Sequence, residues 1–249
     1  MTGPTSTIFT VPQVLDTPYE VPLGGHVLSF YSSDREASDQ AVAFVSGAPE
    51  GLASVYFVDR KETADDYNAR LERESPNHVG CVLFLEHEQV VSDGAHLRPA
   101  AEVVTFLGQH PDGVSAAGDT ISRYWDAGSL PQHLEYERWF QEQPRASSRF
   151  LCPYDLRRVP ADEAPGVLGE LGKHHSHVVL SSSAEPAVRL LQLFVFGTPG
   201  DLPKDLGPDL EWAQGEGFVH DAAADEPLVL TPEGRSVVRE WADRTTVDW

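Results

Sequence analysis

The segment His26-Val27-Leu28-Ser29-Phe30-Tyr31 runs directly into Ser32-Ser33-Asp34-Arg35-Glu36. Its first six residues are mostly apolar and do not alternate, as is typical of a parallel strand covered on both faces. In an open α/β sheet, ligands bind where the strands end at their carboxyl side, which is where the polar residues follow. We therefore interpret this segment as the first strand and the ligand-facing turn of an α/β domain.

Five further apolar runs follow the first strand, at residues 54–59, 79–87, 113–119, 149–155 and 177–182. Segments with helical periodicity lie between several of them, at 62–73, 97–107 and 129–142. Strands that alternate with helices predict a doubly wound, mostly parallel sheet. We assign it to residues 26–183, preceded by an N-terminal arm of residues 1–25 that is rich in Thr and Pro and has an extended piece at 7–14.

The pattern changes after Ser183. Helical segments at 187–195 and 210–217 are followed by two short strands, at 218–220 and 227–230, and by a final helix that begins with Thr231-Pro232-Glu233. This order of helix, hairpin and helix within about 60 residues is the layout of a small winged helix. Residues 184–249 are therefore predicted to form a winged-helix-like domain.

The chain is strongly acidic, with 39 Asp and Glu residues against 18 Lys and Arg and a formal net charge of −21. Such a surface repels nucleic acid and anionic membranes in dilute buffer. At molar salt the screening length falls to about 3 Å, so the repulsion largely vanishes. The composition therefore favours a halophilic protein, with an ordinary acidic protein as the alternative, and leaves DNA binding in brine open.

The chain has no signal for membrane insertion or export. No run approaches the roughly 20 apolar residues that a membrane-spanning helix needs, and Met1–Thr10 lacks the features of a secretory signal. We expect a cytoplasmic protein without a membrane partner. In that compartment Cys81 and Cys152 are expected to be reduced, buried thiols, which cannot form a zinc site by themselves.

The turn after the first strand lacks the chemistry of a phosphate loop. Such a loop needs glycines, so that backbone amides can approach phosphate, and a Lys-Ser/Thr pair. Ser32–Glu36 has neither, and it puts the carboxylates of Asp34 and Glu36 where phosphate would lie. We therefore expect that the protein is not an enzyme. An NTPase-like enzyme built on the same sheet is the alternative.

Glu137 interrupts the apolar face of the helix predicted at 129–142. With about 100° per residue, Leu130, Leu134 and Phe140 form one arc, and Glu137 falls inside it. A carboxylate that faces the core costs several kcal/mol unless it is paired or protonated. We predict that Glu137 is buried with a partner, either as a structural salt bridge or cap or as a ligand anchor.

The run Lys173-His174-His175-Ser176-His177 raises the question of a metal site. His175 and His177 would share one face of a strand, but no carboxylate or cysteine lies at a supporting spacing. A polar entrance to the strand is the favoured interpretation, so we predict no metal site and no cofactor. Asp119 and Asp155, which follow or end strands, are either caps or ligand groups.

Residues 24–182 resemble the MEDS domain, a sensory domain of transcriptional regulators and signalling proteins. The resemblance is carried by four motifs, which are His26–Tyr31, Gly118-Asp119, Leu134-Glu135-Tyr136-Glu137 and Leu151–Asp155 with Arg157-Arg158 behind it. It implies a fold related to the RecA-like ATPases, with the phosphate loop lost and the nucleotide face reused for sensing. The ligand-binding positions that it implies are His26, Asp119, Glu137, Tyr154 and Asp155, where Asp119 stands in place of a glutamate.

The C-terminal segments Glu216–His220 and Leu228–Arg235 are similar to the wing and closing helix of winged-helix regulators. This similarity implies DNA binding, for which Arg235 and Arg239 lie four apart on the closing helix and could contact one stretch of phosphates. The segment carries five basic against thirteen acidic residues, whereas a DNA reader usually shows a basic face.

Our leading hypothesis is a transcriptional regulator that senses an unknown small-molecule effector and binds DNA. Formation of a homodimer is left open. The alternative is a signalling adaptor that does not bind DNA and uses the C-terminal domain for protein contacts or dimerisation.

Overall fold

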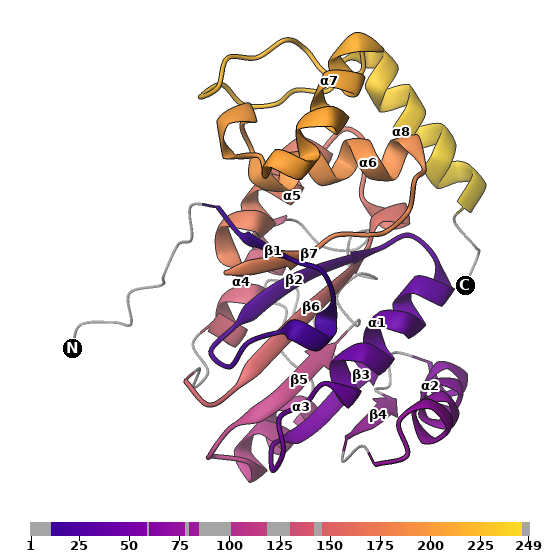
Figure 1. Cartoon of the computed structure of the whole chain (residues 1–249), viewed down its shortest axis with the longest axis vertical. Helices are drawn as coiled ribbons and strands as arrows, with labels where there is room; N and C mark the ends of the chain where they lie inside the picture. The colour runs from indigo at the N-terminus through magenta and orange to yellow at the C-terminus, as the bar shows by residue number, and fades with distance from the viewer. Residues whose placement is uncertain are drawn as a thin grey trace, which may run out of the picture.

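The computed structural model describes residues 11–58, 60–77, 80–84, 101–118, 130–141 and 146–245. A sheet of seven parallel strands runs through the molecule, with helices on both of its faces (Figure 1). Its strands, in spatial order, are β1 (Gln13–Leu15), β7 (His177–Val179), β2 (His26–Tyr31), β6 (Arg149–Asp155), β5 (Val114–Gly118), β3 (Ala53–Val58) and β4 (Cys81–Phe84). The prediction of an α/β fold with a parallel sheet is confirmed.

Helices α1 (Asp34–Ser46) and α2 (Lys61–Glu74) cover one face of the sheet. The opposite face is covered by α3 (Ala101–Gln109), α4 (Leu130–Gln141) and α5 (Ala164–His174). Sequence periodicity located α2, α3 and α4 but not α1 or α5. Helix α1 starts directly after β2, where the Ser33 hydroxyl accepts a hydrogen bond from the Glu36 amide and caps the helix.

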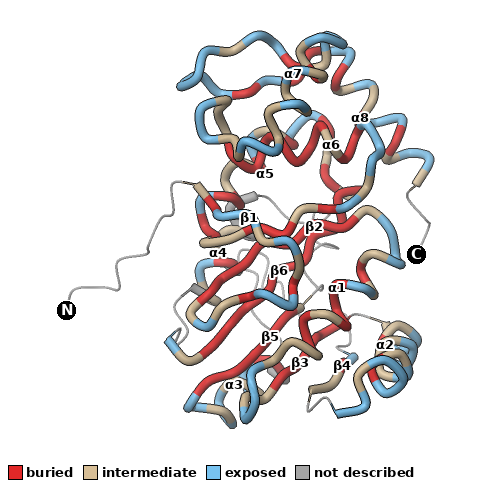
Figure 2. Tube along the Cα trace, viewed as in Figure 1, coloured by how far each residue is buried: buried red, intermediate tan, exposed pale blue. Residues whose placement is uncertain are grey.

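Successive residues of the central strands are buried on opposite faces, as the period of two requires. In β6, Leu151 packs toward α1 and α2, whereas Cys152 and Tyr154 pack on the other face. Every residue of β2 and β6 is buried (Figure 2). This double burial explains why the two strands are continuous apolar runs in the sequence.

Part of the N-terminal arm belongs to the sheet. Gln13–Leu15 pairs with β7 as an edge strand, while residues 1–10 lie outside the described residues. The fully buried Arg149 anchors the following segment, because its guanidinium donates to the Val21 carbonyl at 3.3 Å and to the Phe44 carbonyl of α1. Burial lowers the pKa of Arg149 to about 10, so these carbonyl contacts are what keep the cation in the core.

The C-terminal elements gather at one end of the molecule, beside α5 (Figure 1). They are α6 (Pro186–Leu193), α7 (Gly207–Gly215) and α8 (Pro232–Thr245). The hairpin predicted between α7 and α8 is a single antiparallel bridge, Val219 to Leu230, and the winged-helix assignment remains a prediction. One buried cluster continues from Tyr154 through α5 and α6 to Trp241, so the C-terminal elements share a core with the sheet.

No helix in the described ranges combines the length and the apolar character that a membrane crossing requires.

The contact between α5 and the C-terminal elements is closest at Gly172, in the last turn of α5. A Cβ atom on Gly172 would come within 2.1 Å of the Val195 carbonyl oxygen, which lies in the short 3₁₀ helix Phe194–Phe196. No real structure accommodates such a distance, so the two backbones must separate if residue 172 has a side chain. Glycine is required here by a close approach and not by an unusual backbone conformation.

We expect Gly172→Ala to lower the free energy of unfolding by about 1–3 kcal/mol, the usual cost of overpacking a core. The matched control is Gly166→Ala in the same helix, where an added Cβ meets no heavy atom within 4 Å. That variant should be neutral or more stable by up to about 1 kcal/mol, because alanine favours the helix. Urea unfolding of both variants measures the difference, and equal stabilities would contradict the close packing at Gly172.

Candidate functional site

Four polar side chains from four separate elements meet inside the protein, on the face covered by α4 and α5. His26 opens β2, Glu137 lies in α4, Cys152 lies in β6, and His175 directly follows α5. All four residues are buried, and one potential metal-ligand atom of each lies within 4.8 Å of the other three. We call these four residues the His/Glu/Cys cluster.

The two histidines converge on one carboxylate oxygen. Oε2 of Glu137 lies 3.2 Å from Nε2 of His26 and 3.3 Å from Nε2 of His175. The Cys152 sulfur lies 3.2 Å from Nε2 of His26. The two imidazole rings are stacked, with 4.2 Å between their centroids, so the cluster is compact as well as buried.

Backbone carbonyl groups fix the orientation of both rings. Nδ1 of His26 lies 3.2 Å from the His174 carbonyl oxygen, and Nδ1 of His175 lies 2.7 Å from the Leu171 carbonyl oxygen. A carbonyl oxygen can only accept a hydrogen bond, so Nδ1 carries the proton in each ring. The neutral form of either ring therefore presents an unprotonated Nε2 to the centre of the cluster.

Glu137 is completely buried, as its position in the apolar arc predicted. The Tyr154 hydroxyl donates a hydrogen bond to its Oε1 atom. Burial raises the pKa of Glu137, but His175 and His26 outweigh this effect and hold the pKa well below its usual value. Glu137 is therefore a carboxylate, yet its Oε2 atom has no hydrogen-bond partner among the described residues.

Cys152 is more than the small buried hydrophobe that its sequence context indicated. Burial raises the pKa of its thiol well above the usual value, and the negative charge of Glu137 raises it further. The sulfur nevertheless faces His26, one of the few side chains able to accept its proton. Cys81, in contrast, is only partly buried on β4 and lies outside the cluster.

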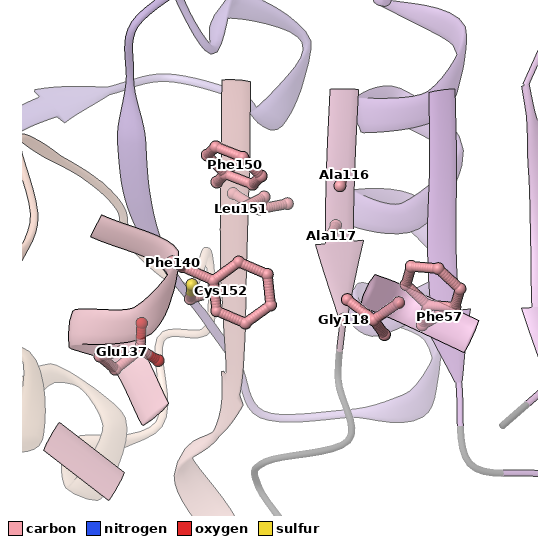
Figure 3. A pocket seen from close by; sticks show the side chains of 10 residues that line it. Phe57, Ala116, Ala117, Gly118, Glu137, Phe140, Phe150, Leu151 and Cys152 are labelled. Atoms are coloured by element: carbon pink, nitrogen blue, oxygen red, sulfur yellow. The ribbon is translucent and has the colours of Figure 1, made fainter. Parts of the chain in front are cut away.

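A pocket with mostly apolar walls is lined by two members of the cluster, Glu137 and Cys152 (Figure 3). Its walls come from β3, β5, β6, α3 and α4, with Glu137 and Cys152 as the polar exceptions. The Phe140 ring lies between the Cys152 sulfur and Gly118 in this view. The free volume is about 10 Å³, which is room for about one water-sized molecule. The lining residues are Phe57, Val103, Ala116, Ala117, Gly118, Glu137, Phe140, Phe150, Leu151 and Cys152.

The carboxyl edge of the sheet, where a nucleotide would bind, is filled by Glu36. Its carboxylate accepts hydrogen bonds from the Ser32 amide at 2.8 Å, the Ser182 amide at 2.7 Å and the Ser181 hydroxyl at 2.8 Å. These donors are of the kind that cradles phosphate in a phosphate loop. An internal carboxylate thus occupies the position of the anion, as the turn sequence indicated.

Asp155, a further position implied by the MEDS resemblance, does not join the cluster. Asp155 caps the short 3₁₀ helix Leu156–Arg158 and accepts hydrogen bonds from the Arg157 guanidinium at 2.8 Å. This geometry agrees with its interpretation as a strand-end cap. Asp119 lies outside the described residues. His26, Glu137 and Tyr154 are therefore the implied positions that the fold brings together.

Two members of the cluster, His175 and Cys152, were not predicted as site residues from the sequence. His175 was considered together with His177, but His177 is only partly buried and contacts the Ser176 hydroxyl. The statement that no carboxylate or cysteine supports the histidines holds for the linear sequence and is wrong for the fold. Glu137 and Cys152 reach His175 from other elements. The one sequence signal for this site was the position of Glu137 on the apolar face of its helix.

The chain matches no protein-family model, no curated protein and no solved structure. The MEDS and winged-helix resemblances accordingly stay predictions.

We expect no ATP hydrolysis above a protein-free blank, because Glu36 occupies the amides that a phosphate group would need. Phosphate release from ATP with Mg²⁺, measured from low to molar potassium chloride, tests this expectation. Turnover above the blank that disappears in an Arg35→Ala variant would contradict it, since Arg35 lies in the first turn of α1, next to Glu36.

Proposed function

We propose that the chain is a ligand-sensing regulatory protein of the cytoplasm, in which the α/β domain binds a small apolar molecule. The observation that carries the proposal is the pocket of Figure 3, whose walls are mostly apolar and whose polar lining residues, Glu137 and Cys152, belong to the buried cluster. Pockets for small molecules commonly combine apolar walls with a few fixed polar groups. The free volume admits about one water-sized molecule, so a larger ligand has to displace side chains of the wall.

The closed carboxyl edge supports sensing over nucleotide chemistry. A nucleotide would have to displace the Glu36 carboxylate from two backbone amides and three hydroxyl groups. It would also bring its phosphates next to Asp34, which already pairs with Arg157. The alternative of an NTPase-like enzyme on this sheet is therefore disfavoured by charge as well as by geometry.

Helix α5 offers a physical route from the pocket to the C-terminal elements. Its last turn supplies the Leu171 and His174 carbonyl groups that orient the two histidines. The same turn contacts the backbone of Val195 at Gly172. A ligand that shifts Glu137 or the imidazole rings would have to move this turn, and the C-terminal elements would follow. We propose that regulation of a partner passes through this contact.

Filling the pocket should abolish ligand binding. We expect Gly118→Val to project a side chain into it at the end of β5, where a β-branched residue suits the strand. A series of small hydrocarbons and halocarbons should raise the melting temperature of the wild type, and the rise should be lost in Gly118→Val. The matched control is Gly108→Val on α3, where an added Cβ meets no heavy atom within 4 Å.

The control should respond like the wild type. If no compound in the series stabilises the wild type, or if both variants respond equally, the pocket is not a ligand site. For any compound that binds, hydrogen exchange should also slow in α6 and α8, and an unchanged exchange there would contradict the proposed route through α5.

Sequence-selective DNA binding by the C-terminal elements is the second candidate function. It is favoured by the order α7, bridge, α8, with the Thr231 hydroxyl accepting a hydrogen bond from the Gly234 amide at 3.0 Å and starting α8. The predicted phosphate contacts are engaged elsewhere, because Arg239 donates to Asp162 at 2.6 Å and Arg235 lies 3.9 Å from the same carboxylate. Helix α7 carries no basic residue. DNA would therefore have to compete with Asp162.

This competition gives DNA binding a specific test. Asp162→Asn should release Arg239 and strengthen binding, while Arg235 keeps its hydrogen bond to the Leu230 carbonyl. Arg235→Ala with Arg239→Ala should weaken binding and reduce the salt slope by about 2. Fluorescence titration against promoter DNA from low to molar potassium chloride measures both effects. If neither the wild type nor Asp162→Asn binds throughout this range, the C-terminal elements act on a protein partner, as in the adaptor alternative.

A further inference from the structure

We propose that the His/Glu/Cys cluster binds one divalent transition-metal ion, for which Zn²⁺ is the best fit. Its ligands would be Nε2 of His26, Nε2 of His175, Oε2 of Glu137 and Sγ of Cys152. The inference deepens the proposed function, because the pocket on which that function rests is lined by two of these ligands. It replaces the expectation of no metal that followed from the linear spacing of the histidines.

The distances within the cluster fit a tetrahedral ion. Zinc binds nitrogen, oxygen and sulfur at about 2.0–2.3 Å, so the edges of its coordination tetrahedron are roughly 3.3–3.8 Å long. The Glu137 oxygen lies 3.2 and 3.3 Å from the two imidazole nitrogens, and the sulfur lies 3.2 Å from the His26 nitrogen. All four ligand atoms lie within 4.8 Å of one another, so the side chains would close in on a single ion when it binds.

The direction of the groups is a second argument. Oε2 of Glu137 and Nε2 of His175 are 3.3 Å apart, yet neither has a hydrogen-bond partner among the described residues. A proton shared between the two atoms should produce a hydrogen bond at this distance. Because Nδ1 of His175 carries the ring proton, both atoms are acceptors with no proton between them, as ligand atoms are around an ion. Leaving a buried carboxylate oxygen and an imidazole nitrogen unsatisfied is costly, and a cation at that point removes the cost.

The surroundings already have the form of an outer coordination shell. Histidine ligands usually donate their second ring nitrogen to a carbonyl or carboxylate, and ligating carboxylates are themselves hydrogen-bonded. Both Nδ1 atoms here face backbone carbonyl groups, and Tyr154 donates to the other oxygen of Glu137. These contacts orient the rings and the carboxylate before any ion binds.

The charge balance also favours a divalent ion. Binding would release one proton from the Cys152 thiol to solvent, leaving a thiolate and the Glu137 carboxylate against a charge of +2. The complex would then be neutral, as burial demands.

The experiment measures metal content and a spectroscopic signature on the full-length chain. Protein purified without a histidine tag or chelator should contain about one zinc per chain by mass spectrometry of the metal. After removal of zinc, titration with Co²⁺ should give the visible bands of tetrahedral cobalt and a thiolate-to-cobalt charge-transfer band. The charge-transfer band reports directly on cysteine as a ligand.

The chain offers matched controls for two ligands. Cys152→Ser should lose the charge-transfer band, whereas Cys81→Ser, which changes the cysteine outside the cluster, should retain it. His175→Gln should weaken cobalt binding by roughly 100-fold or more, since even outer-shell changes cost 10- to 100-fold, whereas His177→Gln should bind like the wild type. Circular dichroism of each variant confirms its folding, and Cys152→Ser is conservative enough to keep the core filled.

Absence of both zinc and the cobalt bands, or equal spectra of the two cysteine variants, would overturn the proposal and leave a cluster held together by protons alone. The same measurements distinguish a failure of the metal site from a failure of the proposed sensing function. If cobalt binds as expected while no small apolar molecule stabilises the protein, the metal site stands without the sensing function. If apolar molecules bind and no metal does, the pocket stands and the metal site is wrong.

Discussion

The rest of the structure depends on the burial of one carboxylate, that of Glu137. An ion without exposed surface must be compensated inside the protein, or it lowers stability by several kcal/mol. Here compensation comes from His26, His175 and Tyr154, which belong to β2, to the end of α5 and to β6. The need to satisfy one acid therefore fixes α4 against two strands and a second helix. It also gives the interior a polar centre within otherwise apolar walls.

This centre changes how the fold can be used. Doubly wound sheets normally bind ligands at the carboxyl ends of their strands, but here that edge is closed by Glu36 and by the ion pairs of Arg157. The chemistry-bearing side chains lie instead within the face of the sheet, reached through a pocket between strands and helices. The function and the metal site that we propose both follow from the position of these polar side chains, which lie in the interior and not at the carboxyl edge of the sheet.

The same geometry relates the interior to the C-terminal elements. The last turn of α5 orients both histidines through its carbonyl groups and meets the Val195 backbone at Gly172. Because the buried core is continuous from Tyr154 to Trp241, packed side chains connect the cluster to the C-terminal elements. Coupling through packed elements of this kind requires two distinct arrangements of the turn, and the ligand or ion that we propose at Glu137 would favour one of them.

Local information was enough for several features. Continuous apolar runs located β2 and β6 because both faces of these strands are covered, and the missing glycines after β2 excluded a phosphate loop. Helical periodicity was also enough to bury Glu137, since its neighbours at helical spacing are apolar. Such features depend on residues close together in the chain, so the sequence alone determined them.

The tertiary structure decided what Glu137 meets. His26, Cys152 and His175 come from distant segments, and their spacing along the chain carries no trace of a shared site. The crossover connections of a parallel sheet bring them together, because strands far apart in the chain, such as β2 and β6, pair side by side. Helix α5 and the role of Gly172 were likewise invisible, since a close approach of two backbones leaves no periodic pattern. A site assembled by topology can be recognised only when the topology is known.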